Sequence, residues 1–280
     1  MKDNKSTIIY PSVIALLVLI LFIPIYKGLF ERFTARDSYY SHGFLIPFIS
    51  LFLVWRRRKI LKTLPVKPCG VGLFVLAGGV IIYLISLALK INFSSYFAIP
   101  IIINGIVLYA GGKKITKELL FPIWFLVFML PLPKVLIIGV AYKLKSIVGE
   151  WAAFAVGKMG IEAKRVGSTI HYPGGFLLIG DPCSGLRSLI SFLALGALFT
   201  QFTDVSLWKK NVVFLFTIPI ALFSNFLRVI SLVVLSYIYG EGITKGFAHD
   251  FSGIMVFIIG FLCFLGVIKL LKCPIKTEVI

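Results

Sequence analysis

Acidic residues are scarce in this sequence. It holds 11 aspartates and glutamates against 29 lysines and arginines, and charged residues of both signs make up only 14% of its 280 residues. A globular domain in water carries roughly 25% charged residues. A chain that is 59% hydrophobic has too few polar side chains to cover its own exterior in water. These shortages exclude a soluble protein and predict an integral membrane protein.

Sequence patterns for metals, disulfides and common catalytic sites are also missing. The four cysteines, at positions 69, 183, 263 and 273, form no CxxC pair and no zinc-ligand spacing. No HExxH, GxSxG or P-loop pattern occurs, so we expect no metal and no cofactor. No acidic residue lies near the middle of a long apolar run, which argues against a proton-coupled transporter or an aspartyl intramembrane protease.

The basic residues, which leave a net charge of +18, are distributed in short clusters. Clusters such as 56–59, 113–114 and 209–210 lie between apolar runs and do not form one continuous face. This distribution is typical of the cytoplasmic loops of membrane proteins. We therefore expect no nucleic-acid partner.

Apolar runs that could cross the ~30 Å hydrocarbon core of a bilayer recur along the chain. They cover approximately 8–29, 43–55, 71–89, 96–111, 119–133, 184–202, 212–239 and 251–271. The sequence therefore predicts an all-α polytopic membrane protein with about eight transmembrane helices. Because a membrane bundle is usually one unit, we expect a single membrane-embedded domain over residues 1–280.

The basic loops also predict the orientation in the membrane. When the N-terminus is placed in the cytoplasm, the basic clusters fall on the cytoplasmic side, and so do both termini. Residues 134–165 are the exception, because basic residues recur there among apolar ones at roughly helical spacing. We interpret this stretch as an amphipathic helix on the outer membrane face. A ninth span is the alternative.

Residues 166–182 have the composition of strands and turns. Two short apolar runs, 167–172 and 176–179, flank Pro173-Gly174-Gly175, which predicts a short β-hairpin. The hairpin would stand outside the membrane. It would lead the chain to Cys183, at the outer end of the sixth run.

Polar groups inside a membrane are costly, and they indicate function by default. On the predicted topology, Cys183 and His249 lie at the outer ends of the sixth and eighth runs. Arg228 lies roughly 16 Å from the outer end of the seventh run, at about 1.5 Å per residue. Asn225 precedes Arg228 by three residues and shares its helical face. These groups could converge on one site in the outer half of the bundle.

A thiol, an imidazole and a guanidinium together suit acyl transfer on a peptide bond. The imidazole can take the thiol proton and return it to the leaving amine, and the guanidinium can stabilise an oxyanion. We also expect the nearby cation to lower the pKa of the Cys183 thiol. A lone cysteine is more often a packing residue, and His42 and His171 compete with His249 as the base. The residue pattern alone does not choose among the three histidines.

The ordered set of motifs resembles the exosortase family of membrane cysteine enzymes. The central motif reads Asp181-Pro182-Cys183-Ser184-Gly185-Leu186-Arg187-Ser188-Leu189. The remaining motifs are Tyr40-Ser41-His42-Gly43, Phe128-Met129-Leu130-Pro131-Leu132-Pro133, Pro219-Ile220-Ala221, Asn225-Phe226-Leu227-Arg228 and His249-Asp250-Phe251-Ser252-Gly253. The resemblance covers about residues 37–265.

The resemblance implies a cysteine protease or transpeptidase of the cytoplasmic (inner) membrane, with its active site on the outer face. Its substrates would be exported proteins that end in a PEP-CTERM-like tail: a short motif such as Pro-Glu-Pro, a transmembrane helix and a basic cluster. The enzyme would transfer the cleaved protein to an acceptor such as a polysaccharide or a lipid, often alongside exopolysaccharide production. By motif match the catalytic residues are Cys183, Arg228 and His249, and the supporting residues are Asn225, Arg187 and His42.

A different class of function is the alternative. The chain could be a non-enzymatic component of envelope polysaccharide or lipid transport, in which Asn225 and Arg228 line a substrate path. Replacement of Cys183 by serine separates the two hypotheses, because transport should survive it and thiol catalysis should not. Membrane lipids surround the protein on either hypothesis.

Overall fold

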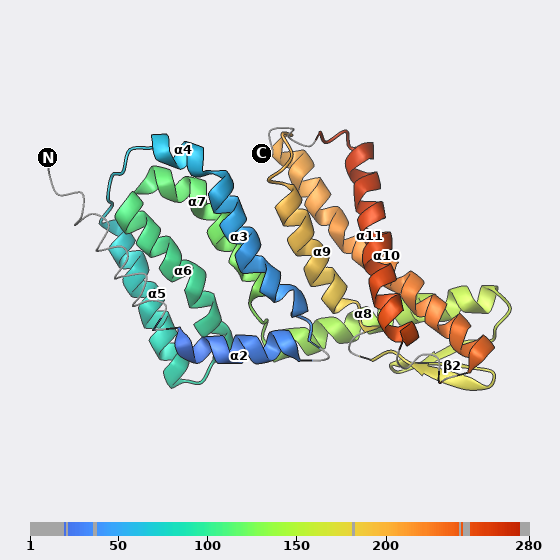
Figure 1. Ribbon diagram of the computed structural model, residues 1–280. Coiled ribbons are helices and arrows are strands. Elements are labelled where there is room, and N and C mark those ends of the chain that lie inside the picture. The colour runs from blue at the N-terminus through green and yellow to red at the C-terminus, as the bar shows by residue number, and fades with distance from the viewer. Residues whose placement is uncertain are drawn as a thin grey trace, which may run out of the picture. The chain divides into compact units, whose positions relative to one another are not determined.

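The computed structural model describes residues 20, 22–35, 38–180, 183–240, 242 and 247–274, with residues 247–250 described as helical backbone only. The chain is mostly helical. It divides into two compact units, one ending at Leu132 and one beginning at Pro133 (Figure 1). Each unit is described by itself, and the single domain over residues 1–280 stays a prediction.

The described residues of the first unit form helices and the loops between them. The helices are α2 (Ile23–Thr34), η1 (Ser41–Phe44), α3 (Leu45–Arg56), α4 (Arg58–Thr63), α5 (Val71–Ala88), α6 (Asn92–Gly111), α7 (Lys113–Phe125) and η2 (Leu126–Met129). The consecutive helices α5 and α6 pack backbone against backbone, because glycines lie at their contact. A Cβ on Gly72 would stand 2.2 Å from the backbone nitrogen of Tyr109, and one on Gly105 would stand 2.6 Å from that of Leu76. Small residues permit this approach between membrane helices.

The described residues of the second unit form four helices and a small sheet. Its elements are α8 (Lys134–Lys158), β1 (Lys164–Val166), β2 (Thr169–Tyr172), β3 (Gly175–Leu178), α9 (Leu186–Phe199), α10 (Leu207–Tyr239) and α11 (Phe247–Leu270). Helices α9 and α11 begin at the end of the unit where α10 finishes (Figure 1). Helix α8 lies across that end and contacts both α10 and the sheet.

The sheet is antiparallel, in the order β1-β2-β3. Strands β2 and β3 flank the turn at Pro173-Gly174, where Gly174 has a φ of +87° that favours glycine. The sequence predicted two strands here, and the structure adds β1. Side chains alternate across the sheet, so Ile170 and Tyr172 face a buried cluster shared with α8 and α10.

Helix α8 occupies most of the stretch predicted to be an amphipathic helix. Its buried face, which includes Leu144 and Val148, packs toward α10 and the sheet. Its other face exposes Tyr142, Trp151 and Phe154. Its position at the outer membrane surface stays a prediction.

Within the described residues, four helices are long and apolar enough to cross a membrane: α5, α6, α10 and residues 251–270 of α11. A fifth is reached if 113–129 and 134–158 form one broken span. The sequence predicted eight, and most of the first predicted run lies outside the described residues. Two further runs correspond to helical segments too short for this criterion, 41–56 and 186–199. The protein is thus a membrane protein with several apolar helices, and the count of eight stays a prediction.

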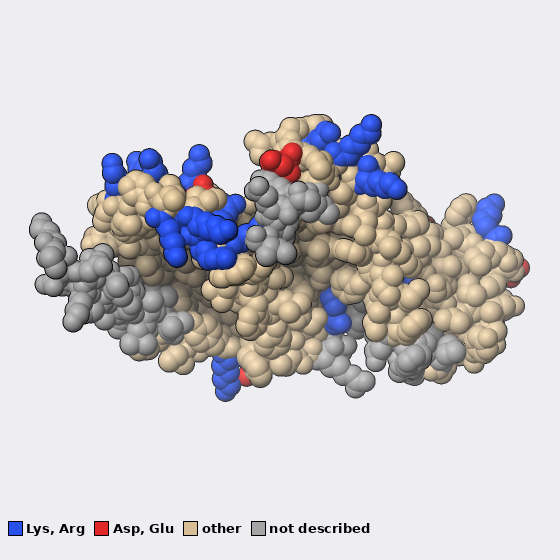
Figure 2. Space-filling model, turned by 45° about the horizontal axis from the view of Figure 1, so that its top comes forward, with Lys and Arg blue, Asp and Glu red and all other residues tan. Residues whose placement is uncertain are grey.

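Basic loop residues gather at one end of the first unit. This end holds α4 and the start of α7 (Figure 2), where Arg57 binds Glu118 at 2.6 Å. In the second unit basic residues lie at both ends. One end holds the start of α10 and the end of α11, where Lys209 Nζ donates to the Leu271 carbonyl at 3.2 Å, and basic residues of α8 and β1 lie toward the other. This other end is the one at which α9 begins, and Cys183 lies there.

Candidate functional site

Cys183 lies in the loop between the sheet and α9, with its side chain buried. Its backbone nitrogen donates to the Gly180 carbonyl at 3.1 Å, and Asp181 and Pro182 lie outside the described residues. The side chain is 7% exposed and belongs to the buried cluster that also contains Tyr172 of β2 and Val229 of α10. Segments far apart in the sequence therefore build the surroundings of the thiol.

The residues after Cys183 form the start of α9. Gly185 has a φ of +80°, in the left-handed region, and the helix begins at the next residue. Ser184 Oγ accepts a hydrogen bond from the Leu186 nitrogen at 3.3 Å, and Ser188 Oγ donates to the Gly185 carbonyl at 2.9 Å. Cys183 thus lies just before a helix N-terminus, where unpaired N–H groups favour negative charge.

Asn225 connects α10 to the cysteine loop. Its Nδ2 donates to the carbonyl oxygen of Cys183 at 3.1 Å, and its side chain is 1% exposed. A Cβ on Gly185 would stand 2.8 Å from the same Nδ2. The glycine is therefore required both by its backbone conformation and by the closeness of the asparagine.

Arg228, one helical turn after Asn225, connects α10 to α11. Its Nε donates to Ser252 Oγ at 3.0 Å, and its Nη2 is the nearest atom, at 3.9 Å, to a Cβ placed on Gly253. His249 lies three residues before Ser252 on α11, while its side chain lies outside the described part of the chain. The segments that carry Cys183, Asn225, Arg228 and Ser252 are thus linked by hydrogen bonds.

The charge state of Cys183 differs from the sequence-based expectation. Burial raises the pKa of the Cys183 thiol, and the positive charges of Arg228, Lys145 and Arg187 oppose this increase without cancelling it. The prediction of a lowered pKa is therefore wrong, because removal of the thiolate from water outweighs its attraction to the cations. Arg187, which the motif match predicts to be a supporting residue, is one of the three cations that act on the thiol.

Lys145 is the residue of this group that the sequence analysis missed. It lies on α8, which the sequence predicted as a separate surface helix. Only the packing of α8 against α10 and the sheet brings its charge near Cys183. Nothing in the sequence distinguishes Lys145 from the neighbouring lysine at position 143.

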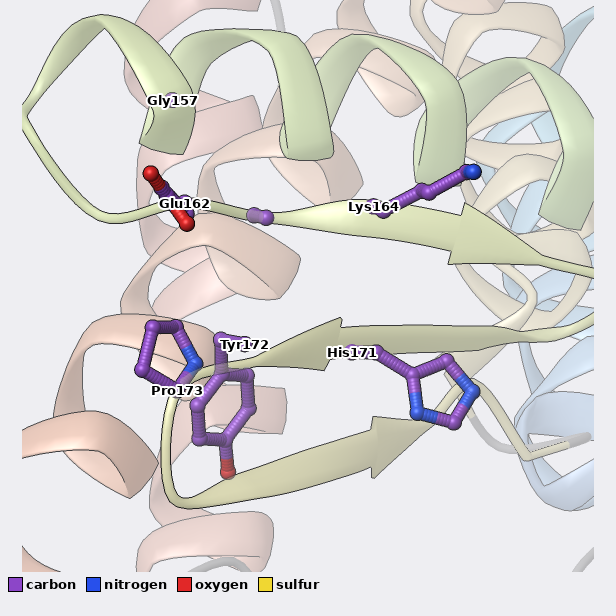
Figure 3. A pocket seen from close by; sticks show the side chains of 7 residues that line it. Gly157, Glu162, Lys164, His171, Tyr172 and Pro173 are labelled. Atoms are coloured by element: carbon purple, nitrogen blue, oxygen red, sulfur yellow. The ribbon is translucent and has the colours of Figure 1, made fainter.

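His171 lies on the opposite face of the sheet from the cysteine cluster. Its neighbours in β2, Ile170 and Tyr172, are buried with Cys183, whereas His171 is exposed. It stands across from Lys164 of β1 beside an open cleft of about 530 Å³ that Glu162 also lines (Figure 3). In the described ranges no three His, Cys, Asp or Glu side chains come together as a metal site would require. The structure does not bring His171 to the thiol.

His42 lies in η1 of the first unit. Its Nε2 is 3.3 Å from the carbonyl oxygen of Phe128, and the hydroxyl of Tyr40 accepts a hydrogen bond from the Leu132 nitrogen at 2.9 Å. The motif at 40–43 therefore contacts the motif at 128–133. These contacts give His42 a structural partner, and a supporting role in catalysis stays a prediction.

Comparison with known proteins agrees with this set of motifs. A family model described as transmembrane exosortase matches residues 32–266, close to the 37–265 expected from the resemblance. Searches of curated proteins and of solved structures gave no match. The family match spans the motif at 40–43, the cysteine loop, α10 and most of α11. This chain therefore belongs to the transmembrane exosortase family.

Proposed function

We propose that this protein is a membrane-embedded cysteine peptidase or transpeptidase that cleaves the C-terminal sorting tails of exported proteins. The tails are PEP-CTERM-like, with a short motif, a transmembrane helix and a basic cluster. Cys183 is the nucleophile, and Arg228 and His249 complete the site. One observation carries the proposal: hydrogen bonds link the Cys183 loop to α10 through Asn225, and α10 to α11 through Arg228 and Ser252.

The chemistry is acyl transfer through a thioester. His249 takes the proton from the buried thiol, and the Cys183 sulfur attacks the carbonyl carbon of the scissile bond. The guanidinium of Arg228, which stays protonated, stabilises the oxyanion of the tetrahedral intermediate. The C–N bond then breaks as His249 returns the proton to the leaving amine. Water or a hydroxyl or amino group of a polysaccharide or lipid acceptor finally replaces the sulfur.

The site is placed on the outer face of the cytoplasmic membrane, with both termini in the cytoplasm. The short loops at 56–67 and 204–211 carry basic clusters that the positive-inside rule assigns to the cytoplasm, and the basic residues of 134–165 are assigned to the outer surface as the exception. In the second unit Cys183 lies at the end opposite the 204–211 loop. A substrate held in the same bilayer by its own transmembrane helix would present the segment just outside the membrane to this end.

The nucleophile is tested by removal of single cysteines. Cys183→Ala should abolish cleavage of an exported reporter that carries a sorting tail, because the sulfur forms the acyl intermediate. Cys263→Ala is the matched control, since Cys263 packs on α11 near the other end of the unit, and it should cleave normally. Mobility of the reporter on denaturing gels measures both. Normal cleavage by Cys183→Ala would show that the thiol mechanism is wrong.

The same experiment separates the enzyme from a transport component. A transport role predicts that Cys183→Ser supports normal polysaccharide or lipid export while the reporter is never cleaved, even by the unaltered protein. The proposed enzyme predicts cleavage by the unaltered protein and none by Cys183→Ser, whose hydroxyl is a much weaker nucleophile at the same position.

A further inference from the structure

Asn225, like Ser236 with its bond to Tyr172 of β2, differs from Thr217 and Ser224 of α10 in where its hydrogen bond goes. The hydroxyl of Ser224 donates to the Ile220 carbonyl at 2.8 Å, and that of Thr217 donates to the Phe214 carbonyl at 2.5 Å. Both bonds are internal to the helix. Asn225 instead donates to the carbonyl of Cys183, which lies 42 residues away in the sequence.

The other end of the Asn225 amide is unsatisfied. Its Oδ1 is buried and accepts no hydrogen bond from any residue that the structure describes. A buried polar atom without a partner destabilises a folded protein. Leucine, which has nearly the same shape, would fill the space without this cost. Leucine would, however, leave the Cys183 carbonyl without its donor, so what distinguishes the asparagine is its bond to the cysteine loop.

The amide restrains the loop at two points. Nδ2 holds the carbonyl of Cys183, and the same atom occupies the space in which a side chain on Gly185 would lie. The backbone is therefore held on both sides of Ser184, directly before α9 begins. Because Arg228 follows Asn225 by one turn of the same helix, the restraint also sets the position of the thiol relative to the guanidinium.

We propose that Asn225 is the positioning residue of the nucleophile, and that its side-chain amide holds the loop 183–185 in the reactive arrangement against α10. The proposal rests on the proposed function of Cys183. It assigns to Asn225 a role in the rate of the chemical step and in the accessibility of the thiol. It assigns no contact with the substrate.

Asn225→Leu tests the proposal, with Ser224→Ala as the matched control. Ser224 is buried next to Asn225, and its replacement removes a polar group at the same depth without touching the loop. Asn225→Leu should lower kcat for reporter cleavage by about 100-fold, the effect of a misplaced reactive group, with KM little changed. Alkylation of Cys183 by iodoacetamide should become faster, because release of the loop exposes the thiol. The thermal midpoint should change little, because the loss of the donor to the Cys183 carbonyl is offset by removal of the buried Oδ1.

Opposite changes in cleavage and alkylation distinguish positioning from a structural role. Asn225→Ala, which also lacks the donor, should show the same pair of changes and serves if the leucine variant does not fold. Normal cleavage by either folded variant would overturn the proposal. The proposal would also be overturned if cleavage were lost together with a lower thermal midpoint while the alkylation rate of Cys183 stayed unchanged.

The experiments distinguish a failure of the role proposed for Asn225 from a failure of the proposed function. Normal cleavage by Cys183→Ala removes the thiol mechanism, and the alkylation rates of the Asn225 variants still report whether the amide restrains the loop. An inactive Cys183→Ala combined with a fully active Asn225→Leu removes only the role of Asn225.

Discussion

The thiol of Cys183 is subject to two opposing influences. Contacts with apolar side chains of β2 and α10 withdraw it from water, which disfavours the thiolate, while Arg228, Lys145 and Arg187 favour it. Burial dominates, and it raises the pKa of the thiol. The resting thiol is therefore protonated near neutral pH, and the proposed reaction requires a base that removes the proton when substrate is bound.

The raised pKa predicts how alkylation of Cys183 depends on pH. The thiolate is the reactive form, so the rate should be low at mildly acidic and neutral pH and should increase as the pH rises above the ordinary range of cysteine. Arg228→Leu should move this increase to still higher pH, because Arg228 is the first of the charges that lower the pKa. Mass spectrometry of the labelled cysteine at a series of pH values measures the shift.

Lys143→Leu is the control for that experiment, since it removes an exposed cation of α8 that is not among the charges acting on the thiol. Its alkylation profile should match that of the unaltered protein. Alkylation that is already maximal at mildly acidic pH would contradict the raised pKa and would support the lowered pKa expected from the sequence.

Among the helices, α5 and α6 show most directly how a membrane hairpin is held together. A hydrogen bond from Ser86 Oγ to Ser94 Oγ at 2.8 Å joins them beside their connecting loop, and lipid supplies no hydrophobic force between them. Their contact depends instead on glycines that let the two backbones approach, at Gly72, Gly79 and Gly105. Gly78, one residue before Gly79, faces open space.

Two glycines of α5 give a matched pair of variants. Gly72→Ala places a methyl group against the backbone of Tyr109, so α5 and α6 must separate, and we expect a loss of about 1–3 kcal/mol of stability. Gly78→Ala meets no atom within 4 Å and should leave the thermal midpoint unchanged or slightly raised. Thermal denaturation in detergent micelles measures both. Equal midpoints for the two variants would show that this contact does not hold the helices together.

Over the whole molecule, the distribution of basic residues predicts the orientation in the membrane. The loops at 56–67 and 204–211 carry the clusters that the positive-inside rule assigns to the cytoplasm. Within the second unit, the sheet lies next to Cys183, at the end opposite the 204–211 loop. The two ends should therefore be reached from opposite sides of the membrane.

Single introduced cysteines test this topology. Lys62→Cys and Lys210→Cys should react with a membrane-impermeant maleimide only after the cytoplasmic side is opened. Lys164→Cys, an exposed lysine of β1, is the control of the same residue type and should react from outside in intact cells. Labelling of Lys62→Cys from outside alone would invert the topology and place Cys183 in the cytoplasm.

Much of the protein follows from local properties of its sequence. The shortage of charge requires a lipid environment. An isolated span in lipid must satisfy its own backbone hydrogen bonds, and the long apolar runs accordingly correspond to helices, at 71–89, 96–111, 212–239 and 251–271. The family follows from motifs whose order along the chain is visible without a structure. The choice of Cys183, Asn225 and Arg228 as candidate site residues also needed only their types and spacing, and hydrogen bonds link the segments that carry them.

The remaining features depend on contacts between distant segments, and only the tertiary structure decided them. Position 185, directly before α9, requires glycine because Asn225 occupies the space in which a side chain would lie. The pKa of Cys183 is raised because β2, α8 and α10 cover the thiol. His171 faces away because strand alternation puts its neighbours, Ile170 and Tyr172, into that cover. Burial and electrostatic proximity arise from packing between elements, and a residue pattern along one chain does not contain them.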